Sequence, residues 1–376
     1  MDDIDQSRFD NRHEWLDASA AAKRLGVKTA TLYTYVSRGL IRRVPGADGR
    51  SRYAAADVER VRSRKDARAG HGAVAAGALR WGEPVIDTEV GGVTPEGPIY
   101  RGRRVLDLLE TPFQGVVHLL LDLDGPELVL GGAPVGALDA RPLTDHLMQA
   151  VLADAGPDRH LLPPIEAAHR ILRSLASAVP GLADAPREER DAALVLVADH
   201  ELNASTLAAR VAASTGADLH GCVLAALATL SGPRHGGAGE RVEVLLDEVA
   251  ASSATETLRA RLRRGDALPG FGHPLYPDGD PRCPPLLAMA ERLAPEHPHV
   301  RAALGLDAAA RAAGHLLPNL DVGLVAIAAA LGLPRRCSVG LFAVGRAAGW
   351  MAHALEQRAA GYLLRPRARY VGTQPG

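Results

Sequence analysis

Residues 198–211 read Ala198-Asp-His-Glu-Leu-Asn-Ala-Ser-Thr-Leu-Ala-Ala-Arg-Val211, the first of four segments in which reactive side chains lie among glycines and prolines. The others are Leu230-Ser-Gly-Pro-Arg-His-Gly-Gly-Ala-Gly-Glu240, Leu268-Pro-Gly-Phe-Gly-His-Pro-Leu-Tyr-Pro-Asp-Gly-Asp-Pro-Arg282, and Leu317-Pro-Asn-Leu-Asp321 with Leu341-Phe-Ala-Val-Gly-Arg-Ala-Ala-Gly-Trp350. Taken singly, each has a structural explanation as a helix cap, a loop donor or a tight turn. We expect no metal, because the histidines lack the spacing of zinc ligands and no second histidine follows His200-Glu201 at the required distance.

The sequence around these segments favours helices. From about residue 78 onward, alanine-rich stretches with helical spacing alternate with Gly- and Pro-rich joints at 155–164, 179–187, 231–239, 265–285 and 314–319. This alternation predicts a mainly α-helical chain.

Composition narrows the class of protein further. The 376 residues carry a formal net charge of -1 and are 47% hydrophobic, which excludes a disordered chain. Cys222, Cys283 and Cys337 cannot form a disulfide framework, and the acidic start has no apolar run of a secretory signal. The most apolar later stretch, 323–333, is shorter than the about 20 residues that span a bilayer. We therefore expect a cytoplasmic protein of two or three domains.

A small basic module precedes the helical body. Residues 14–66 hold twelve basic and six acidic residues, although the whole chain is nearly neutral. Asp17 and Ser19 are suited to cap a helix that Gly26 ends, and a second helix is predicted to start at Thr29 or Thr31 and run to Arg38. The turn residues 45–50 predict a hairpin wing, and residues 57–65 a third helix. Two helices joined by a tight glycine turn form the helix-turn-helix plan.

The segment from Ala22 to Ile41 resembles the helix-turn-helix of MerR-like regulators and excisionases. In such a module the second helix can enter a major groove. The candidate nucleic-acid contacts are Lys28, Thr31 and Tyr35 for bases, and Arg42, Arg43, Arg50 and Arg52 for phosphates, with Arg38 as a further candidate. The alternative is a solvated basic face that contacts other proteins.

Taken together and in this order, the four segments resemble the citrate synthase family. Further matches are the motif Arg-x-x-Gly-Trp-x-x-His-x-x-Glu-Gln, which begins at Arg346, the tail 365–372, and the early segment 100–109. The resemblance implies citrate synthase-like large and small helical domains after the helix-turn-helix. The expected boundaries are 14–66 for the helix-turn-helix, 67–77 for a linker, 78–235 and 332–376 for the large domain, and 236–331 for the small domain.

The resemblance also implies a reaction, in which acetyl-CoA condenses with oxaloacetate and water to give citrate and CoA, as in the tricarboxylic acid cycle. Asp321 is then the base that takes a proton from the acetyl methyl group, and His235 donates to the thioester oxygen. His273 polarises the ketone of oxaloacetate. Arg282, Arg346 and Arg365, with His200, bind its two carboxylates, which suit planar guanidinium groups. The resemblance places Arg365 across a homodimer interface. It implies an acyltransferase without a cofactor, since acetyl-CoA is a substrate.

Several positions depart from the family pattern. The family usually has Phe-Tyr-Ser-Gly after the aspartate of Pro-Asn-x-Asp, whereas Val-Gly-Leu-Val follows Asp321. Pro274 and Pro277 stand where CoA-binding cations are common, so Arg261, Arg263 and Arg264 are candidates to replace them. Two alternatives remain open: a 2-methylcitrate synthase that uses propionyl-CoA, and a DNA-binding metabolite sensor with little turnover.

Overall fold

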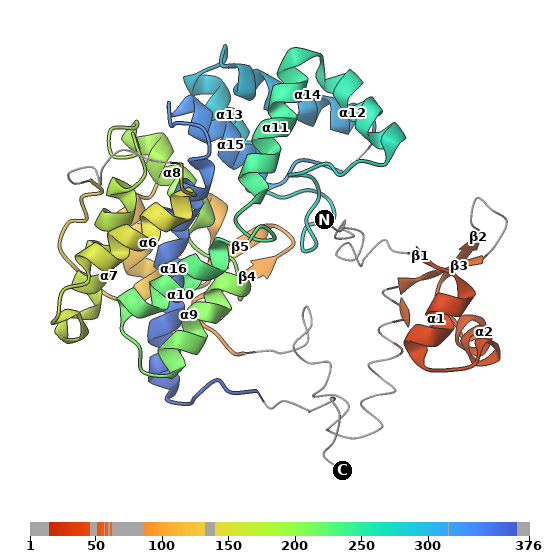
Figure 1. Cartoon of the computed structure of the whole chain (residues 1–376), viewed down its shortest axis with the longest axis horizontal. Coiled ribbons are helices and arrows are strands. Elements are labelled where there is room, and N and C mark those ends of the chain that lie inside the picture. Colours follow the sequence, from red (N-terminus) through yellow and green to blue (C-terminus); the bar gives the residue numbers. More distant parts are fainter. Residues whose placement is uncertain are drawn as a thin grey trace. The chain divides into compact units, whose positions relative to one another are not determined.

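The chain divides into two compact units, one of residues 1–87 with 367–376 and one of residues 88–366. The computed structural model describes residues 15–45, 51–55, 57–58, 61, 86–131, 140–314 and 316–366. The predicted linker 67–77 lies outside these residues. The structure is mainly helical, as the sequence predicts (Figure 1).

The N-terminal unit has the predicted helix-turn-helix. Helix α1 (Ala18–Leu25) begins at Asp17, whose carboxylate accepts from the Ala20 amide, and ends at Gly26 in the left-handed conformation with φ 59°. Helix α2 (Thr29–Ser37) follows after a short turn. Leu25 and Leu32 are buried in the core of this unit, together with Ile41 and Tyr53. These buried side chains form the face that holds the two helices together.

A three-stranded antiparallel sheet completes the N-terminal unit. Its order is β1 (Trp15–Leu16), β3 (Ser51–Ala54), β2 (Arg43–Pro45), with Arg43 opposite Tyr53. The predicted hairpin wing is thus present as the pair β2–β3, although its turn at 46–50 is outside the described residues. Of the predicted third helix, Asp57, Val58 and Val61 are described and helical.

The second unit begins with a small antiparallel sheet that the sequence did not predict. It consists of β4 (Gly91–Thr94), β5 (Gly97–Tyr100) and β6 (Arg103–Arg104) in that order. Tyr100 ends β5 and its buried hydroxyl lies 2.9 Å from the Val195 carbonyl oxygen and 3.0 Å from the Asp199 amide. The sheet is therefore anchored beside the first of the four motif segments.

Helices form the rest of the second unit. They are the short η2 (Val105–Leu108) and η3 (Arg159–Leu161), then α5 (Phe113–Leu121), α6 (Leu143–Asp154), α7 (Pro164–Ser177), α8 (Arg187–Val197), α9 (Ala204–Ser214), α10 (Leu219–Leu230), α11 (Ala238–Ala251), α12 (Ala254–Arg264), α13 (Cys283–Leu293), α14 (Pro298–Ala312), α15 (Leu320–Ala330) and α16 (Ser338–Ala360). None of the described helices combines the length and apolarity that a bilayer crossing requires.

Helix α16 is the central element of the second unit (Figure 1). It packs against α5 to α10, and its Trp350 is among the largest fully buried side chains. Helices α11 to α15 pack chiefly on one another, and α15 also contacts α16. The division into a large and a small domain at 235/236 and 331/332 stays a prediction.

Candidate active site

Three aromatic side chains from two distant segments form the centre of the site. His200 lies in the connection between α8 and α9, and its Nε2 is 2.9 Å from the hydroxyl of Tyr276. The rings of His200 and His273 meet edge to face at 5.3 Å between centroids. Burial, together with the cations of Arg282 and Arg346, lowers the pKa of His200 well below its usual range. His200 is therefore a neutral hydrogen-bonding group at physiological pH.

The loop that carries His273 is held by the segment before α15. Gly270 and Gly272 adopt positive φ values of 78° and 69°, which non-glycine residues rarely adopt. Asn319 is bound twice to this loop, because its amide donates to the Gly270 carbonyl at 2.8 Å and its side-chain Nδ2 to the Gly272 carbonyl at 2.9 Å. The third and fourth motif segments are thus joined by direct hydrogen bonds.

The same loop fixes the tautomer of His273. The backbone amide of Leu275 donates to His273 Nδ1 at 3.1 Å, so this nitrogen is an acceptor. A neutral His273 then carries its proton on Nε2. Nε2–H is then the hydrogen-bond donor of the ring.

Arg282 reaches the site beside a carboxylate that the sequence analysis did not single out. Its Nε and Nη2 donate to the two carboxylate oxygens of Asp280 at 2.9 and 2.8 Å. Its guanidinium carbon lies 5.7 Å from the ring centroid of Tyr276. Asp280 also accepts from the Leu320 amide at 3.2 Å, which ties it to the start of α15. Burial raises the pKa of Asp280, but Arg282 outweighs it and keeps the pKa below its usual value.

Arg346 comes from the middle of α16 and is 1% exposed. Its Nε donates to the Val197 carbonyl at 2.6 Å, and its guanidinium lies over the Phe342 ring at 4.5 Å. Burial lowers the pKa of Arg346 to about 10, an effect that Asp199 opposes. Arg346 therefore stays a cation at neutral pH.

His235 lies in the turn between α10 and α11, where its Nε2 is 2.8 Å from Ser205 Oγ. The same hydroxyl oxygen accepts from Trp350 Nε1 at 3.1 Å. Ser205 has one hydroxyl proton, which it can donate either to His235 Nε2 or to Asn203 Oδ1 at 2.8 Å. Burial lowers the pKa of His235 to about 4, with a further contribution from Arg346. His235 is therefore neutral at pH 7.

Asp321 lies in the first turn of α15, next to the capping residue Asn319, which accepts from the Asp321 amide at 2.9 Å. Burial raises the pKa of Asp321 to about 6, although Arg282 opposes the shift. A carboxylate with a raised pKa is a stronger base that is still ionised at neutral pH.

The structure brings six of the seven predicted site residues into one neighbourhood. Ring contacts join His200 to His273, and Arg282 lies over the ring of Tyr276, which contacts both histidines. Arg346 lowers the pKa of both His200 and His235. Asp280, which holds Arg282, accepts from the amide of Leu320, the residue before Asp321, so the aspartate lies next to this group. The exception is Arg365, which is exposed beyond the end of α16. The chemical roles of all seven residues stay predictions.

The structure adds Tyr276, Asp280 and Ser205, which sequence reasoning missed. Tyr276 and Asp280 belong to the segment 268–282, and Ser205 belongs to the segment 198–211. Their position inside these motifs was the sequence feature that could have identified them as site residues. Of the three arginines suggested for CoA, Arg261 is paired with Glu248 at 2.7 Å and Arg264 with Asp266 at 2.6 Å.

The candidate nucleic-acid residues of the N-terminal unit differ in exposure. Lys28, Arg38, Arg42 and Arg43 are exposed, Thr31, Tyr35 and Arg52 are half-buried, and Arg50 lies outside the described residues. Arg42 is held by Asp57 at 2.8 Å, and Tyr35 packs against the core. The exposed aromatic side chain of α2 is instead Tyr33, which is 51% exposed.

Two family models match the sequence. Residues 167–367 match the model described as citrate synthase, C-terminal domain, and residues 17–73 match that of the MerR HTH family regulatory proteins. Among curated proteins, the 2-methylcitrate synthase of Shewanella oneidensis is 37% identical over 49% of this chain and 50% of its own length. Citrate synthase 2 of Bacillus subtilis is 39% identical over 48% and 50%. The chain spans about half the length of the curated relatives it matches.

Solved structures show the same fold. The citrate synthase of Thermotoga maritima has a TM-score of 0.65 and 24% identity, over 78% of this chain and 95% of that chain. The citrate synthase of Thermoplasma acidophilum, solved as a ternary complex with carboxymethyl coenzyme A and oxaloacetate, has a TM-score of 0.63 and 25% identity over the same shares. The predicted fold class, with a helix-turn-helix at the N-terminus, is thereby confirmed.

Proposed function

The chain belongs to the citrate synthase family, and from this premise we propose that it condenses acetyl-CoA with oxaloacetate and water to give citrate and CoA. The observation that carries the proposal is the convergence of neutral His200 and His235 and buried Arg282 and Arg346 beside Asp321, a carboxylate of raised pKa. The proposed enzyme is a cytoplasmic acyltransferase that needs no cofactor. The three cysteines, each free and buried, are compatible with a reducing compartment.

Asp321 and His235 act on the thioester. Asp321 takes a proton from the methyl group next to the carbonyl. Because its pKa is near 6, it is a stronger base for this weakly acidic C–H group than an ordinary aspartate. His235 donates a hydrogen bond to the thioester oxygen, where negative charge develops. This role requires that Ser205 donates to His235 Nε2, so that the imidazole proton lies on Nδ1.

Oxaloacetate binds between the arginines and the remaining histidines. Arg346 and Arg282 are fixed by the Val197 carbonyl and by Asp280, so each presents its remaining donors in a set direction. His273 carries its proton on Nε2 and donates it to the ketone oxygen, which makes the ketone carbon a better electrophile. The new carbon–carbon bond forms there, and hydrolysis of the resulting thioester releases CoA.

A thiol-release assay tests the proposal directly. Purified full-length protein is mixed with oxaloacetate and acetyl-CoA, and free CoA is measured with a thiol reagent. We expect CoA release that depends on both substrates. A protein that binds oxaloacetate by calorimetry but releases no CoA would instead be a metabolite sensor on this fold.

The same assay decides between acetyl-CoA and propionyl-CoA. Val322 and Gly323 follow Asp321, where the family usually has Phe and Tyr, and these smaller side chains favour room for a larger acyl group. One methylene changes binding by only about 1–3 kcal/mol, so both substrates are expected to react at different rates. A higher kcat/KM for propionyl-CoA would make 2-methylcitrate the main product.

The proposed enzyme is a homodimer in which Arg365 completes the site of the other subunit. Arg365 is exposed, and α9 presents Leu207 and Val211, one turn apart and 36% and 43% exposed. An apolar helical face of this kind is suited to pack on its own copy about a two-fold axis. Size-exclusion chromatography with light scattering measures the oligomeric state.

Hybrid dimers provide a test of the shared site. One subunit carries Asp321→Asn and the other Arg365→Gln, with different tags so that only the heterodimer is purified. Each variant alone should be nearly inactive, whereas the heterodimer should recover roughly half of wild-type activity, because one of its two sites has both native residues. No recovery would mean that Arg365 does not act across the interface.

We further propose that the N-terminal unit binds DNA, on the strength of the MerR-type match and the exposed cations Lys28, Arg38 and Arg43. Binding of the full chain to a mixed-sequence duplex, measured by fluorescence anisotropy, should weaken steeply with salt. Arg43→Ala should reduce the slope of log K against log salt by about 1, and Arg301→Ala, a surface change in the other unit, should not. Absence of binding at low salt would leave a module for protein contacts.

A further inference from the structure

The segment just before His200 lies along α16 and contacts three successive turns of that helix. The Val197 carbonyl accepts from Arg346 Nε at 2.6 Å, and the Ala198 carbonyl accepts from the Gly349 amide at 3.0 Å. The carboxylate of the next residue, Asp199, has its Oδ1 3.3 Å from His353 Nε2. Positions 346, 349 and 353 are spaced three and four apart, so they share one face of the helix.

Asp199 is completely buried at this junction. A Cβ at Gly349 would collide with the Ala198 carbonyl and lie 2.6 Å from Asp199 Oδ1, and a Cβ at Gly91 in β4 would collide with Oδ2. The carboxylate is thus enclosed between a strand and a helix that can approach so closely only because both have glycine there. Neither Asp199 nor His353 has a role in the reaction as proposed above.

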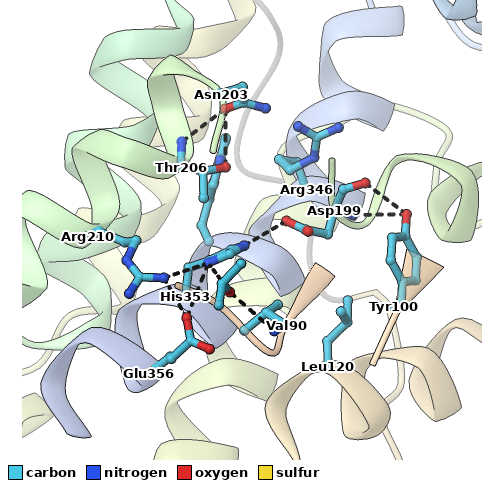
Figure 2. Close-up of polar contacts among 12 residues, drawn as sticks. Val90, Tyr100, Leu120, Asp199, Asn203, Thr206, Arg210, Arg346, His353 and Glu356 are labelled. Atoms are coloured by element: carbon cyan, nitrogen blue, oxygen red, sulfur yellow. Dashed lines mark hydrogen bonds and ion pairs between the residues drawn. The ribbon is translucent and has the colours of Figure 1, made fainter. Parts of the chain in front are cut away.

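A chain of hydrogen bonds sets the orientation of His353 (Figure 2). Arg210 Nη1 is 3.1 Å from His353 Nδ1, and a guanidinium group can only donate, so Nδ1 is the acceptor. The imidazole proton therefore lies on Nε2, the nitrogen that faces Asp199. Arg210 itself is held by Glu356 Oε2 at 2.5 Å and by Gln357 Oε1 at 3.1 Å.

The position of the buried Asp199 carboxylate depends on its contact with His353. Among the described residues, neither of its carboxylate oxygens receives a hydrogen bond of good geometry, so the contact with His353 is what restrains it. Its negative charge also favours the cationic form of Arg346, whose pKa burial lowers to about 10. The Asp199 carboxylate thus stabilises the charge of Arg346 through space. It restrains His200, the next residue in the chain, through the backbone.

We propose that Asp199 and His353 are positioning residues, which fix residues 197–200 against α16 and thereby set the distance between His200 and Arg346. The spacing of these two donors must match one small keto-diacid. This inference rests on the proposed function, because oxaloacetate is the ligand whose binding reports the spacing.

Two substitutions of His353 separate its two contacts. In His353→Gln, the longer amide can reach the position of Nε2 and donate to Asp199. In His353→Asn, the shorter amide reaches only the position of Nδ1, where it can accept from Arg210 but cannot reach Asp199. Both variants remain polar and close in size to histidine, so neither empties the core.

Oxaloacetate affinity is measured by calorimetry on the full-length protein, alongside the KM for each substrate and the melting temperature. We expect His353→Asn to raise the Kd and the KM for oxaloacetate roughly tenfold or more, since small misplacements of binding groups are costly. The KM for acetyl-CoA should stay unchanged, and His353→Gln should restore oxaloacetate binding to near the wild-type value.

His299→Asn is the matched control, because His299 forms a second histidine–aspartate pair away from the site, with Nε2 2.8 Å from Asp247 Oδ1. It should change the melting temperature without changing the oxaloacetate Kd. Equal affinity of His353→Asn and wild type would overturn the inference, and so would equal weakening in the Asn and Gln variants. If the wild-type protein itself does not bind oxaloacetate, the proposed function fails and the inference fails with it.

Discussion

Asp321→Asn is expected to reduce CoA release from acetyl-CoA and oxaloacetate by roughly 10²–10⁴-fold, the usual contribution of a general base. The amide has the shape of the carboxylate but cannot accept the methyl proton. The Asp321 backbone amide still donates to Asn319, so the start of α15 should be preserved. Turnover is measured by thiol release, and undiminished turnover would remove Asp321 from the proposed mechanism.

Oxaloacetate binding and stability are the controls for this variant. Asp321 is not among the proposed ligands of the keto-diacid, so calorimetry should give a Kd close to that of the wild type. Burial raises the pKa of Asp321 from 3.8 to about 6, so the ionised carboxylate destabilises the folded state, and this cost is complete above pH 6. At pH 8 the asparagine variant should therefore melt no lower than the wild type, which would show that the aspartate serves activity rather than stability.

The same pKa predicts the acid side of the activity profile. Only the ionised form of Asp321 can take a proton, so activity should be full well above pH 6 and be lost as the pH falls through about 6. His235 titrates lower, near 4, because burial depresses its pKa, and it stays neutral over this range. The pH dependence of kcat/KM reports the pKa of the free enzyme, so a profile of kcat/KM with an apparent pKa near that of free aspartate would contradict the assignment.

The sequence predicted the helical class and the members of the site because both depend on short motifs. Asn319-Leu-Asp321 starts a helix, and the glycines on either side of Phe271 have the positive φ that a tight loop needs. Each motif therefore specifies its own local geometry. What it does not specify is which motifs meet, and the resemblance to a known family supplied that step.

Contacts between distant segments could not be predicted from residue types alone. Asp280 was quoted only as a member of the segment 268–282, but it holds Arg282 and the amide of Leu320, which is 40 residues away. The sheet β4–β5–β6 was missed because its strands are only two to four residues long, and β4 and β5 begin with glycine, so they have little periodicity.

In the N-terminal unit, too, the sequence predicted helix ends but not which side of a helix is buried. Asp17 and Gly26 predicted the ends of α1 correctly, because capping depends on one residue at one position. The face of α2 was harder to assign. Tyr35 was expected at a groove, but it packs against the core, and Tyr33 is exposed. Two tyrosines that are two residues apart lie on different sides of a helix, and only the tertiary packing decides which is buried.

Arg346→Leu is expected to weaken oxaloacetate binding by roughly 30-fold to several thousand-fold, which corresponds to the about 2–5 kcal/mol lost when one partner of a buried charge pair is removed. Arg346 is 1% exposed and remains charged, so its attraction for a carboxylate is little screened by water. Calorimetry with oxaloacetate measures the loss. Arg301→Leu is the control, because Arg301 has a side chain 69% exposed and a weak ion pair at 3.8 Å.

Arg346→Lys distinguishes a charge effect from an effect of shape. Lysine keeps the positive charge, but it lacks the Nε–H that donates to the Val197 carbonyl and the planar group that lies over Phe342. If only the charge mattered, the lysine variant would bind oxaloacetate as the wild type does. The Val197 contact aims the guanidinium group, so we expect the lysine variant to fall between wild type and Arg346→Leu. A lysine variant as weak as the leucine variant would mean that direction, set by the backbone of residues 197–199, contributes more to binding than the charge itself.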